Sequence, residues 1–178
     1  MDVKETMKNR RSIRKYDDGA VSEEQLFQIL EAAQCAPSWK NMQCWYYIVV
    51  SDKDLKRKLG RAVNFNPDRT SYEKAAYVLV LCADPEKSGD RENKPYYLVD
   101  AAISFQQAIL AATDLGLGTC WVGLFDEQPV KALLDIPENI RIVALTPVGN
   151  SAQTRDAKSR RPLDEFVFSN TWQTPLTD

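Results

Sequence analysis

Residues 95–118, PYYLVDAAISFQQAILAATDLGLG, predict the longest helix of the chain, from about Pro95 to Leu115. Pro95 suits the first turn of a helix, and Gly116 and Gly118 mark its end. Apolar residues recur every three or four positions, and alanines widen the apolar face around the helix. So broad an apolar face predicts a central, largely buried helix. The stripe consists of Leu98, Ala102, Phe105, Ile109 and Ala112, with Ala101 and Ala108 beside it.

Shorter elements are predicted on both sides of this helix. A firm one starts at Ser22, because S-E-E-Q at 22–25 is typical of a capping box, and it stops before Pro37. Uninterrupted apolar runs such as YVLVLCA indicate buried strands. Taken alone, the alternation of strands and helices favours a parallel α/β sheet. The other helices are expected at 3–8, 52–63 and 128–134, and the strands at 45–50, 77–83, 120–123 and 140–148.

The composition is that of an ordinary globular protein. The chain has 178 residues, of which 44% are hydrophobic and 27% charged, and this predicts one domain over residues 1–178. A formal net charge of −2 argues against nucleic acid or an anionic membrane as a partner. The longest apolar run, 75–83, is far shorter than the roughly 20 residues of a membrane-spanning helix. No apolar signal core follows Met1, so we expect a cytoplasmic protein.

The chain contains no histidine, and this excludes more than any other count. Without imidazole there is no Ser-His-Asp or Cys-His catalytic group and no histidine-rich zinc site. Chemistry carried by a cofactor therefore becomes the leading hypothesis. The four cysteines form no C-x-x-C pair and are interpreted as reduced thiols, not as a disulfide or zinc framework; they are Cys35, Cys44, Cys82 and Cys120.

Two basic clusters stand near the two ends of the chain. Each combines basic side chains with a serine, Ser12 in the first and Ser159 in the second. Guanidinium groups beside a short hydroxyl suit a phosphate dianion, although most charge runs are solvated surfaces. Both interpretations stay open on the residues alone. The basic residues are Lys4, Lys8, Arg10, Arg11, Arg14 and Lys15 in the first cluster, and Lys158, Arg160 and Arg161 in the second.

Two further segments carry polar or glycine-rich patterns. The segment APSWKNMQCW at 36–45 offers donors and acceptors from Ser38, Asn41 and Gln43, as the edge of a flavin ring requires, but the same residues suit a connecting turn.

The segment GLGTCWVG at 116–123 is not a dinucleotide fingerprint, because it follows a helix and has tryptophan where the third glycine belongs. Gly123 is left over, and it indicates a close approach of backbone to a ligand.

Four segments in this order resemble the FMN-dependent nitroreductase family over nearly the whole chain. The resemblance implies an α+β fold, with a mixed, largely antiparallel sheet flanked by helices, in an intertwined homodimer. This expectation replaces the parallel sheet. It also implies that the aromatic tail, 162–178, extends over the partner subunit. The four segments are RRSIRKY at 10–16, APSWKNMQCW at 36–45, GLGTCWVGLF at 116–125 and KSRRPLDEF at 158–166.

The resemblance also implies a set of residues that bind FMN at the dimer interface. Arg14 resembles the cation near flavin N1 and the C2 carbonyl, and the Gly123 amide, next to Val122, resembles the donor to flavin N5 or O4. Asn66 and Arg69 match a further pair at the flavin edge. The phosphate and ribityl binders are Arg10, Ser12, Lys158 and Arg160, with Arg11 contributing locally, and the wall from the partner subunit consists of Pro37, Ser38, Trp39, Asn41 and Gln43.

The function implied is an FMN oxidoreductase that takes a hydride from NADH or NADPH and reduces a nitroaromatic or quinone in alternating half-reactions. The flavin carries the hydride, so no side chain is expected to act as a catalytic acid or base, and no metal is required. Alternatives are reductive dehalogenation or other flavin chemistry on the same fold, a flavin-binding protein that is not an enzyme, and a dimeric scaffold without cofactor. A lid-like insertion of larger relatives is missing, which leaves the acceptor open.

Overall fold

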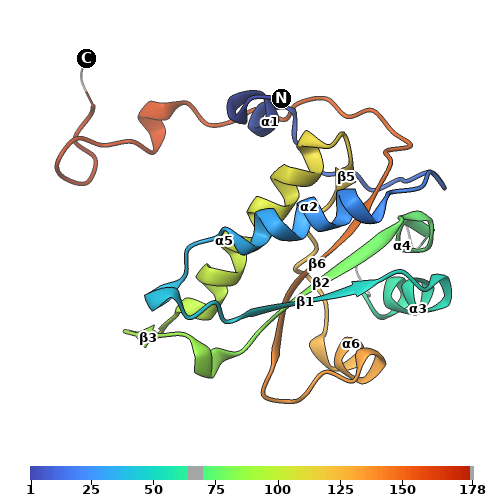
Figure 1. Ribbon diagram of the computed structural model, residues 1–178. Coiled ribbons are helices and arrows are strands. Elements are labelled where there is room, and N and C mark those ends of the chain that lie inside the picture. Colours follow the sequence, from blue (N-terminus) through green and yellow to red (C-terminus); the bar gives the residue numbers. More distant parts are fainter. Residues whose placement is uncertain (64–69, 177–178) are drawn as a thin grey trace.

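The computed structural model describes residues 1–63 and 70–176 (Figure 1). Its helices are α1 (Val3–Asn9), α2 (Glu23–Gln34), α3 (Lys53–Ala62), α4 (Thr70–Lys74), α5 (Tyr96–Asp114) and α6 (Glu127–Leu134). Its strands are β1 (Trp45–Val50), β2 (Tyr77–Ala83), β3 (Asp90–Arg91), β4 (Lys94–Pro95), β5 (Gly118–Thr119) and β6 (Arg141–Gly149). Three short 3-10 turns are η1 (Trp39–Asn41), η2 (Pro85–Lys87) and η3 (Leu163–Glu165).

The main sheet is antiparallel, with strand order β1-β2-β6-β5. The last residue of β1, Val50, pairs with Val78 near the start of β2, so the chain re-enters the sheet from the end at which it left. The helices α3 and α4 between these strands therefore join antiparallel neighbours, and the parallel sheet favoured by the alternation is wrong. A parallel bridge between Ser12 and Thr119 makes the arrangement mixed. The α+β fold with a mixed, largely antiparallel sheet is confirmed.

Helices cover both faces of this sheet, and strand β2 shows why (Figure 1). Its residues alternate between two cores: Leu79 and Leu81 pack with α2 and α5, whereas Val78 and Val80 pack with α3, α4 and α6. Because both faces are buried, the strand is apolar throughout its length. The central helix α5 forms one side of the first core, with Phe105 completely buried there.

Most of the predicted stripe of α5 is buried, with Phe105, Ile109 and Ala112 in the core, but its first turn is rotated. Leu98 is 42% exposed, and Tyr97 is buried in its place. The reason is that α5 also buries two polar residues, Asp100 and Ser104, whose hydrogen bonds to other segments compensate for the loss of water. A hydropathy pattern cannot anticipate such residues. The exposed side of α5 carries Leu98, Val99 and Ile103.

Most of the other predicted elements are confirmed to within a few residues. Helix α2 begins with the capping box, in which Ser22 and Gln25 exchange side-chain bonds to backbone amides. The strand expected at 120–123 is an exception, because β5 ends at Thr119 and only Val122 bridges to β6. The backbone amide of Cys120 donates instead to the hydroxyl of Thr146, which interrupts the ladder. No helix in the described part of the chain is long and apolar enough to span a membrane.

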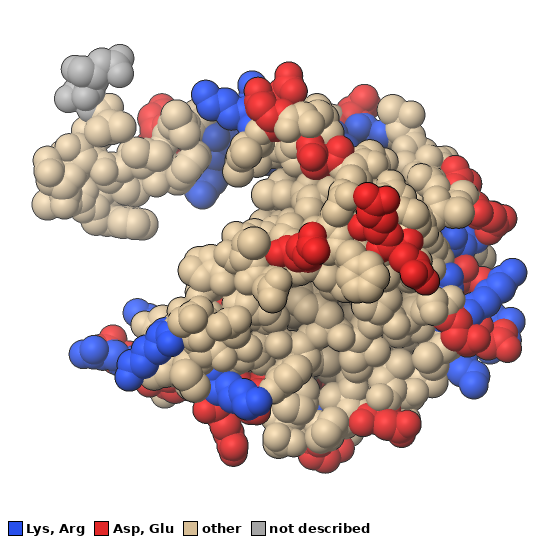
Figure 2. All heavy atoms as spheres, in the orientation of Figure 1, with Lys and Arg blue, Asp and Glu red and all other residues tan. Residues whose placement is uncertain are grey.

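The tail after β6 runs along α1 and then leaves the body of the protein (Figure 1). Figure 2 shows a hollow between the tail and the body. Trp172 is 81% exposed, and it contacts Phe168 within the tail itself, with ring centroids 5.1 Å apart. The aromatic side chains of the tail thus contact each other while much of their surface faces solvent.

Gly118 lets the N-terminal segment approach β5 closely. A Cβ atom at this position would lie 2.8 Å from Cγ2 and 2.9 Å from Cβ of Ile13, closer than such atoms approach each other. Gly118→Ala is therefore expected to lower the free energy of unfolding by about 1–3 kcal/mol, measured by urea denaturation. Ala157→Ser, which adds one atom to an exposed residue, is the control and should leave it unchanged. Equal stability of both variants would contradict the close packing.

Candidate functional site

The N-terminal basic segment is held against the sheet by backbone bonds. Helix α1 ends at Asn9, and the chain then bridges from Ser12 to Thr119, where the amide of Ile13 donates to the Thr119 carbonyl at 2.8 Å. The buried Tyr16 hydroxyl donates to the carbonyl of Ile13 at 2.7 Å. These contacts fix Arg10, Ser12 and Arg14 beside β5.

The C-terminal basic segment reaches the same place from β6. Ser151, just after this strand, bridges to Tyr16, and the amide of Ala152 donates to the carbonyl of Lys15 at 3.0 Å. Arg11 then joins the two segments, because its Nε donates to the carbonyl of Arg155 at 3.2 Å. The structure therefore brings together the two basic clusters from opposite ends of the chain.

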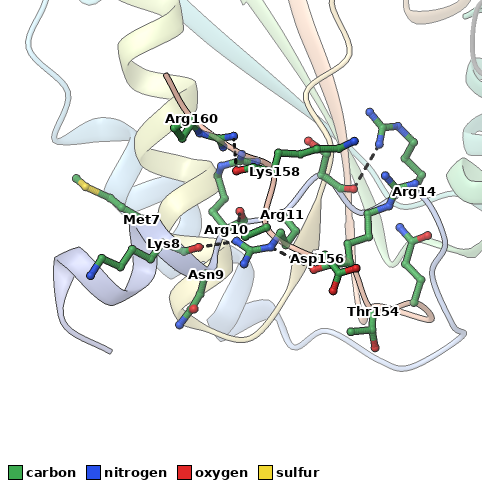
Figure 3. A pocket seen from close by; sticks show the side chains of 14 residues that line it. Met7, Lys8, Asn9, Arg10, Arg11, Arg14, Thr154, Asp156, Lys158 and Arg160 are labelled. Atoms are coloured by element: carbon green, nitrogen blue, oxygen red, sulfur yellow. Dashed lines mark hydrogen bonds between the residues drawn. The ribbon is translucent and has the colours of Figure 1, made fainter. Parts of the chain in front are cut away.

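A cavity of about 1250 Å³ lies between these two segments (Figure 3). Its lining contains seven basic side chains and a single carboxylate, that of Asp156. Such a concentration of positive charge in a concave site attracts anions. The basic residues are Lys8, Arg10, Arg11, Arg14, Arg155, Lys158 and Arg160.

The basic side chains of this cavity differ in what they bind within the protein. The Arg11 guanidinium donates to the carbonyls of Lys8, Arg10 and Arg155, so its role is to hold the cavity walls together. Among the described residues, neither Arg10 nor Lys158 donates a side-chain hydrogen bond or forms an ion pair, so both remain available to a ligand. Arg160 makes two bonds of 3.2 Å to nearby carbonyls of its own segment.

An unpaired donor in the lining supports an anionic ligand. Within the described part of the chain, the Nε2 atom of Gln153 is buried and has no hydrogen-bond partner, and such a group is costly unless something accepts from it. An amide donor, the Ser12 hydroxyl and the free cations Arg10 and Lys158 form a set that fits a phosphate group. By its donor chemistry, the cavity can therefore hold the phosphate end of FMN.

Sequence reasoning missed Arg155 and Gln153 of this lining, and it placed Lys8 in the first basic cluster without assigning it to the ligand. Arg155 lies three residues before Lys158, so a wider window around the second cluster could have found it. No sequence pattern pointed to Gln153, because its position in the cavity lining depends on how the chain turns after β6. Arg161 belongs to the second predicted cluster but stacks on Phe166 in the tail, with its guanidinium 5.4 Å from the ring centroid.

The segment around Val122 and Gly123 follows β5, whose Thr119 is bridged by Ser12 of the cavity lining. Val122 pairs with Leu145 of β6, and the exposed Gly123 follows it. Burial raises the pKa of the neighbouring Cys120 thiol, while the positive charges of Arg14, Arg155 and Arg10 oppose this rise. These three arginines, all in the cavity lining, thus act on Cys120, three residues before Gly123.

The predicted flavin wall lies elsewhere, near the start of α5. This segment comprises Pro37, Ser38, Trp39, Asn41 and Gln43, and the amide of Trp39 donates to the buried Asp100 carboxylate at 3.0 Å. Helix α1, which leads into the basic cavity, instead contacts Asp114 through Thr6 at 3.3 Å. Fourteen residues separate Asp100 from Asp114, which is about 21 Å along a helix. One chain thus holds the two predicted parts of the site at opposite ends of α5. Asn66 and Arg69 lie outside the described residues.

The comparison with known families decides the identity. A model of the nitroreductase family matches residues 7–71 and 66–150. The chain belongs to the nitroreductase family. The basic segment at 10–16 and the segment at 116–123, which lie side by side in the structure, fall within these matches.

Individual members of the nitroreductase family support this assignment. The chain is 37% identical over 153 residues, 83% of its length and 84% of the relative's, to a protein of Archaeoglobus fulgidus named as a candidate NADH dehydrogenase/NAD(P)H nitroreductase. A nitroreductase family protein from Clostridium novyi NT has a similar structure, with a TM-score of 0.81, 36% identity and coverage of 98% of this chain and 97% of that one. An FMN-dependent nitroreductase from Clostridium difficile R20291 also has a TM-score of 0.81, with 30% identity and coverage of 94% and 98%.

Proposed function

We propose that this nitroreductase family member transfers a hydride from NADH or NADPH to a nitroaromatic or quinone acceptor in alternating half-reactions. As a member of the family it is an NAD(P)H-dependent oxidoreductase with FMN as its flavin. The observation that carries the proposal is the convergence of both basic segments on one cavity with unpaired donors. Such a cavity is the site that a phosphorylated flavin requires.

The phosphate end of FMN is assigned to the basic cavity. Arg10, Ser12, Lys158 and Arg160 donate to the phosphate and the ribityl chain, and Arg11 keeps their two segments together. A charge-assisted bond of this kind contributes roughly 1.5–3 kcal/mol. The proposal assigns Arg14 to flavin N1 and the C2 carbonyl, and Val122 and Gly123 to the edge of the ring.

The other wall of the flavin site is assigned to a second copy of the chain. The segment 37–43 lies at the far end of α5 from the basic cavity, and this separation supports its supply to the same flavin by a two-fold partner. The exposed apolar side of α5, with Leu98, Val99 and Ile103, is a surface that such a partner would cover. The tail, 162–178, would then extend over that partner, which gives its exposed aromatic residues a place to bind.

Bound FMN supplies hydride transfer at its ring, and the protein supplies binding, orientation and charge. When FMN is bound, the walls formed by 37–43 and 122–123 would orient its ring, and a ring face left open would serve donor and acceptor in turn. Arg14 would place a positive charge beside the ring and favour its reduced, more negative state. No side chain of the chain is assigned a proton transfer, in keeping with the absence of histidine.

The test of the proposed function is an absorption spectrum of the purified protein, followed by anaerobic titration with NADH and NADPH. We expect a flavin band that at least one nicotinamide bleaches, and turnover with nitroaromatic or quinone acceptors. Bound flavin that neither nicotinamide bleaches would identify a binding protein without this activity. Turnover with halophenols alone would favour dehalogenation. A protein that neither contains nor binds FMN would refute the proposal.

Arg14→Ala tests the electrostatic role of this residue. If Arg14 stabilises the reduced flavin by ~2 kcal/mol more than the oxidised flavin, its loss lowers the two-electron potential by roughly 40 mV. Redox titration of the bound flavin measures this change. Lys15→Ala, which removes a neighbouring exposed charge, serves as the control and should shift the potential much less. An unchanged potential in the Arg14 variant would remove the role assigned to it.

A further inference from the structure

A buried carboxylate inside α5 connects the predicted flavin wall to the central helix. Asp100 is 3% exposed, and its Oδ1 accepts from the backbone amide of Trp39 at 3.0 Å. Its Oδ2 accepts from the Ser88 hydroxyl at 2.9 Å. Among the described residues it has no cationic partner. A buried carboxylate without a counter-ion is costly unless several donors compensate, and here those donors come from two other segments.

The thiol of Cys44 faces the same carboxylate from the end of the wall segment. Its Sγ lies 3.9 Å from Oδ2 of Asp100. Burial, and after it the negative charge of Asp100, raise the pKa of this thiol to about 11, so it stays protonated and acts as a weak donor. The segment from Trp39 to Cys44 is therefore attached to Asp100 at both ends.

The backbone between these two attachments is held in an unfavourable conformation. Lys40, Asn41 and Gln43 have φ values of 47°, 57° and 49°, in the left-handed region that side-chain-bearing residues rarely occupy. Such conformations persist when surrounding contacts over-determine them. Inside the turn, the amide of Gln43 donates to the Ser38 hydroxyl at 2.9 Å. The anchors at Asp100 and Ser38 thus define how Asn41 and Gln43 project from the turn.

The same carboxylate also fixes the loop beneath the Trp39 ring. Ser88, which donates to Asp100, is followed by Gly89, and a Cβ atom on Gly89 would lie 2.6 Å from Cε2 of Trp39. The indole therefore packs directly on the Gly89 backbone, where any side chain would displace it. Asp100 thereby holds both the amide of Trp39 and the surface on which its ring lies.

We propose that Asp100 is a positioning residue for the flavin ring, because its carboxylate holds the turn that presents Asn41 and Gln43. This inference rests on the proposed function, in which that turn forms one wall of the flavin site. Asp100 does not contact the reacting atoms. Its effect is on the isoalloxazine end of the ligand, because the turn that it holds is the proposed ring wall and not part of the cavity for the phosphate.

The experiment compares FMN with riboflavin, which has the same ring but no phosphate. Dissociation constants are measured by quenching of flavin fluorescence, and visible circular dichroism is recorded at saturation. Asp100→Asn is the main variant. Ser88→Ala removes only one donor to the carboxylate, and it provides the test if the Asp100→Asn variant does not fold. Arg10→Ala tests the phosphate end. Asp135→Asn, on an exposed left-handed residue at the end of α6, is the matched control.

We expect Asp100→Asn to weaken FMN and riboflavin by the same factor, roughly tenfold, and to change the visible circular dichroism of the bound flavin. Ser88→Ala should weaken the binding of both ligands by a smaller factor. Arg10→Ala should weaken the binding of FMN alone, and Asp135→Asn should change the binding of neither ligand. The inference would be overturned if the folded Asp100 and Ser88 variants bound both flavins as tightly as the unaltered protein, with an unchanged spectrum. It would also be overturned if these variants bound FMN alone more weakly. Failure of the unaltered protein to bind either flavin would instead overturn the proposed function.

Discussion

Helix α5 sets the distance between the two parts of the site. Its first turns hold the segment 37–43 through Asp100, and its last residue, Asp114, contacts α1 ahead of the basic cavity. A packed helix is rigid, so it keeps these two anchors about 21 Å apart along its axis. This separation supports the proposed two-chain flavin site, in which each chain gives its wall to the flavin held by the cavity of its partner. The helix that separates the two parts of the site also carries the exposed apolar surface that a partner would cover.

The sequence predicts local structure well wherever a local interaction decides it. The capping box at Ser22 and the apolar strand at 77–83 depend on neighbours in the chain, and both are confirmed. The direction of the strands and the exposed side of α5 were not accessible in this way. Strand direction depends on where the chain re-enters the sheet, and the rotation of the first turn of α5 depends on Asp100 and Ser104, whose partners are distant in the sequence.

In the candidate site, too, the sequence predicts the local features but not those that depend on long-range contacts. Both basic clusters were evident as clusters, but their convergence depends on two long-range bridges, Ser12 to Thr119 and Tyr16 to Ser151. Neither bridge has a pattern in the sequence, and the resemblance to the nitroreductase family supplied the expectation that the clusters meet. Residue type alone also does not distinguish Arg11, whose donors are used within the protein, from Arg10, whose side chain donates to none of the residues that the structure describes. Only the geometry separates a residue that builds the cavity from one available to its ligand.

The most direct test of the two-chain site mixes two defective subunits. One variant carries Arg10→Ala and Lys158→Ala in the basic cavity, and the other carries Asn41→Ala and Gln43→Ala in the wall. If each flavin site combines the cavity of one chain with the wall of the other, the isolated heterodimer contains one intact site. The account predicts one FMN bound with native affinity per heterodimer, measured by flavin fluorescence and absorbance. A heterodimer that binds no better than either parent would contradict it, because both parts of each site would then belong to one chain.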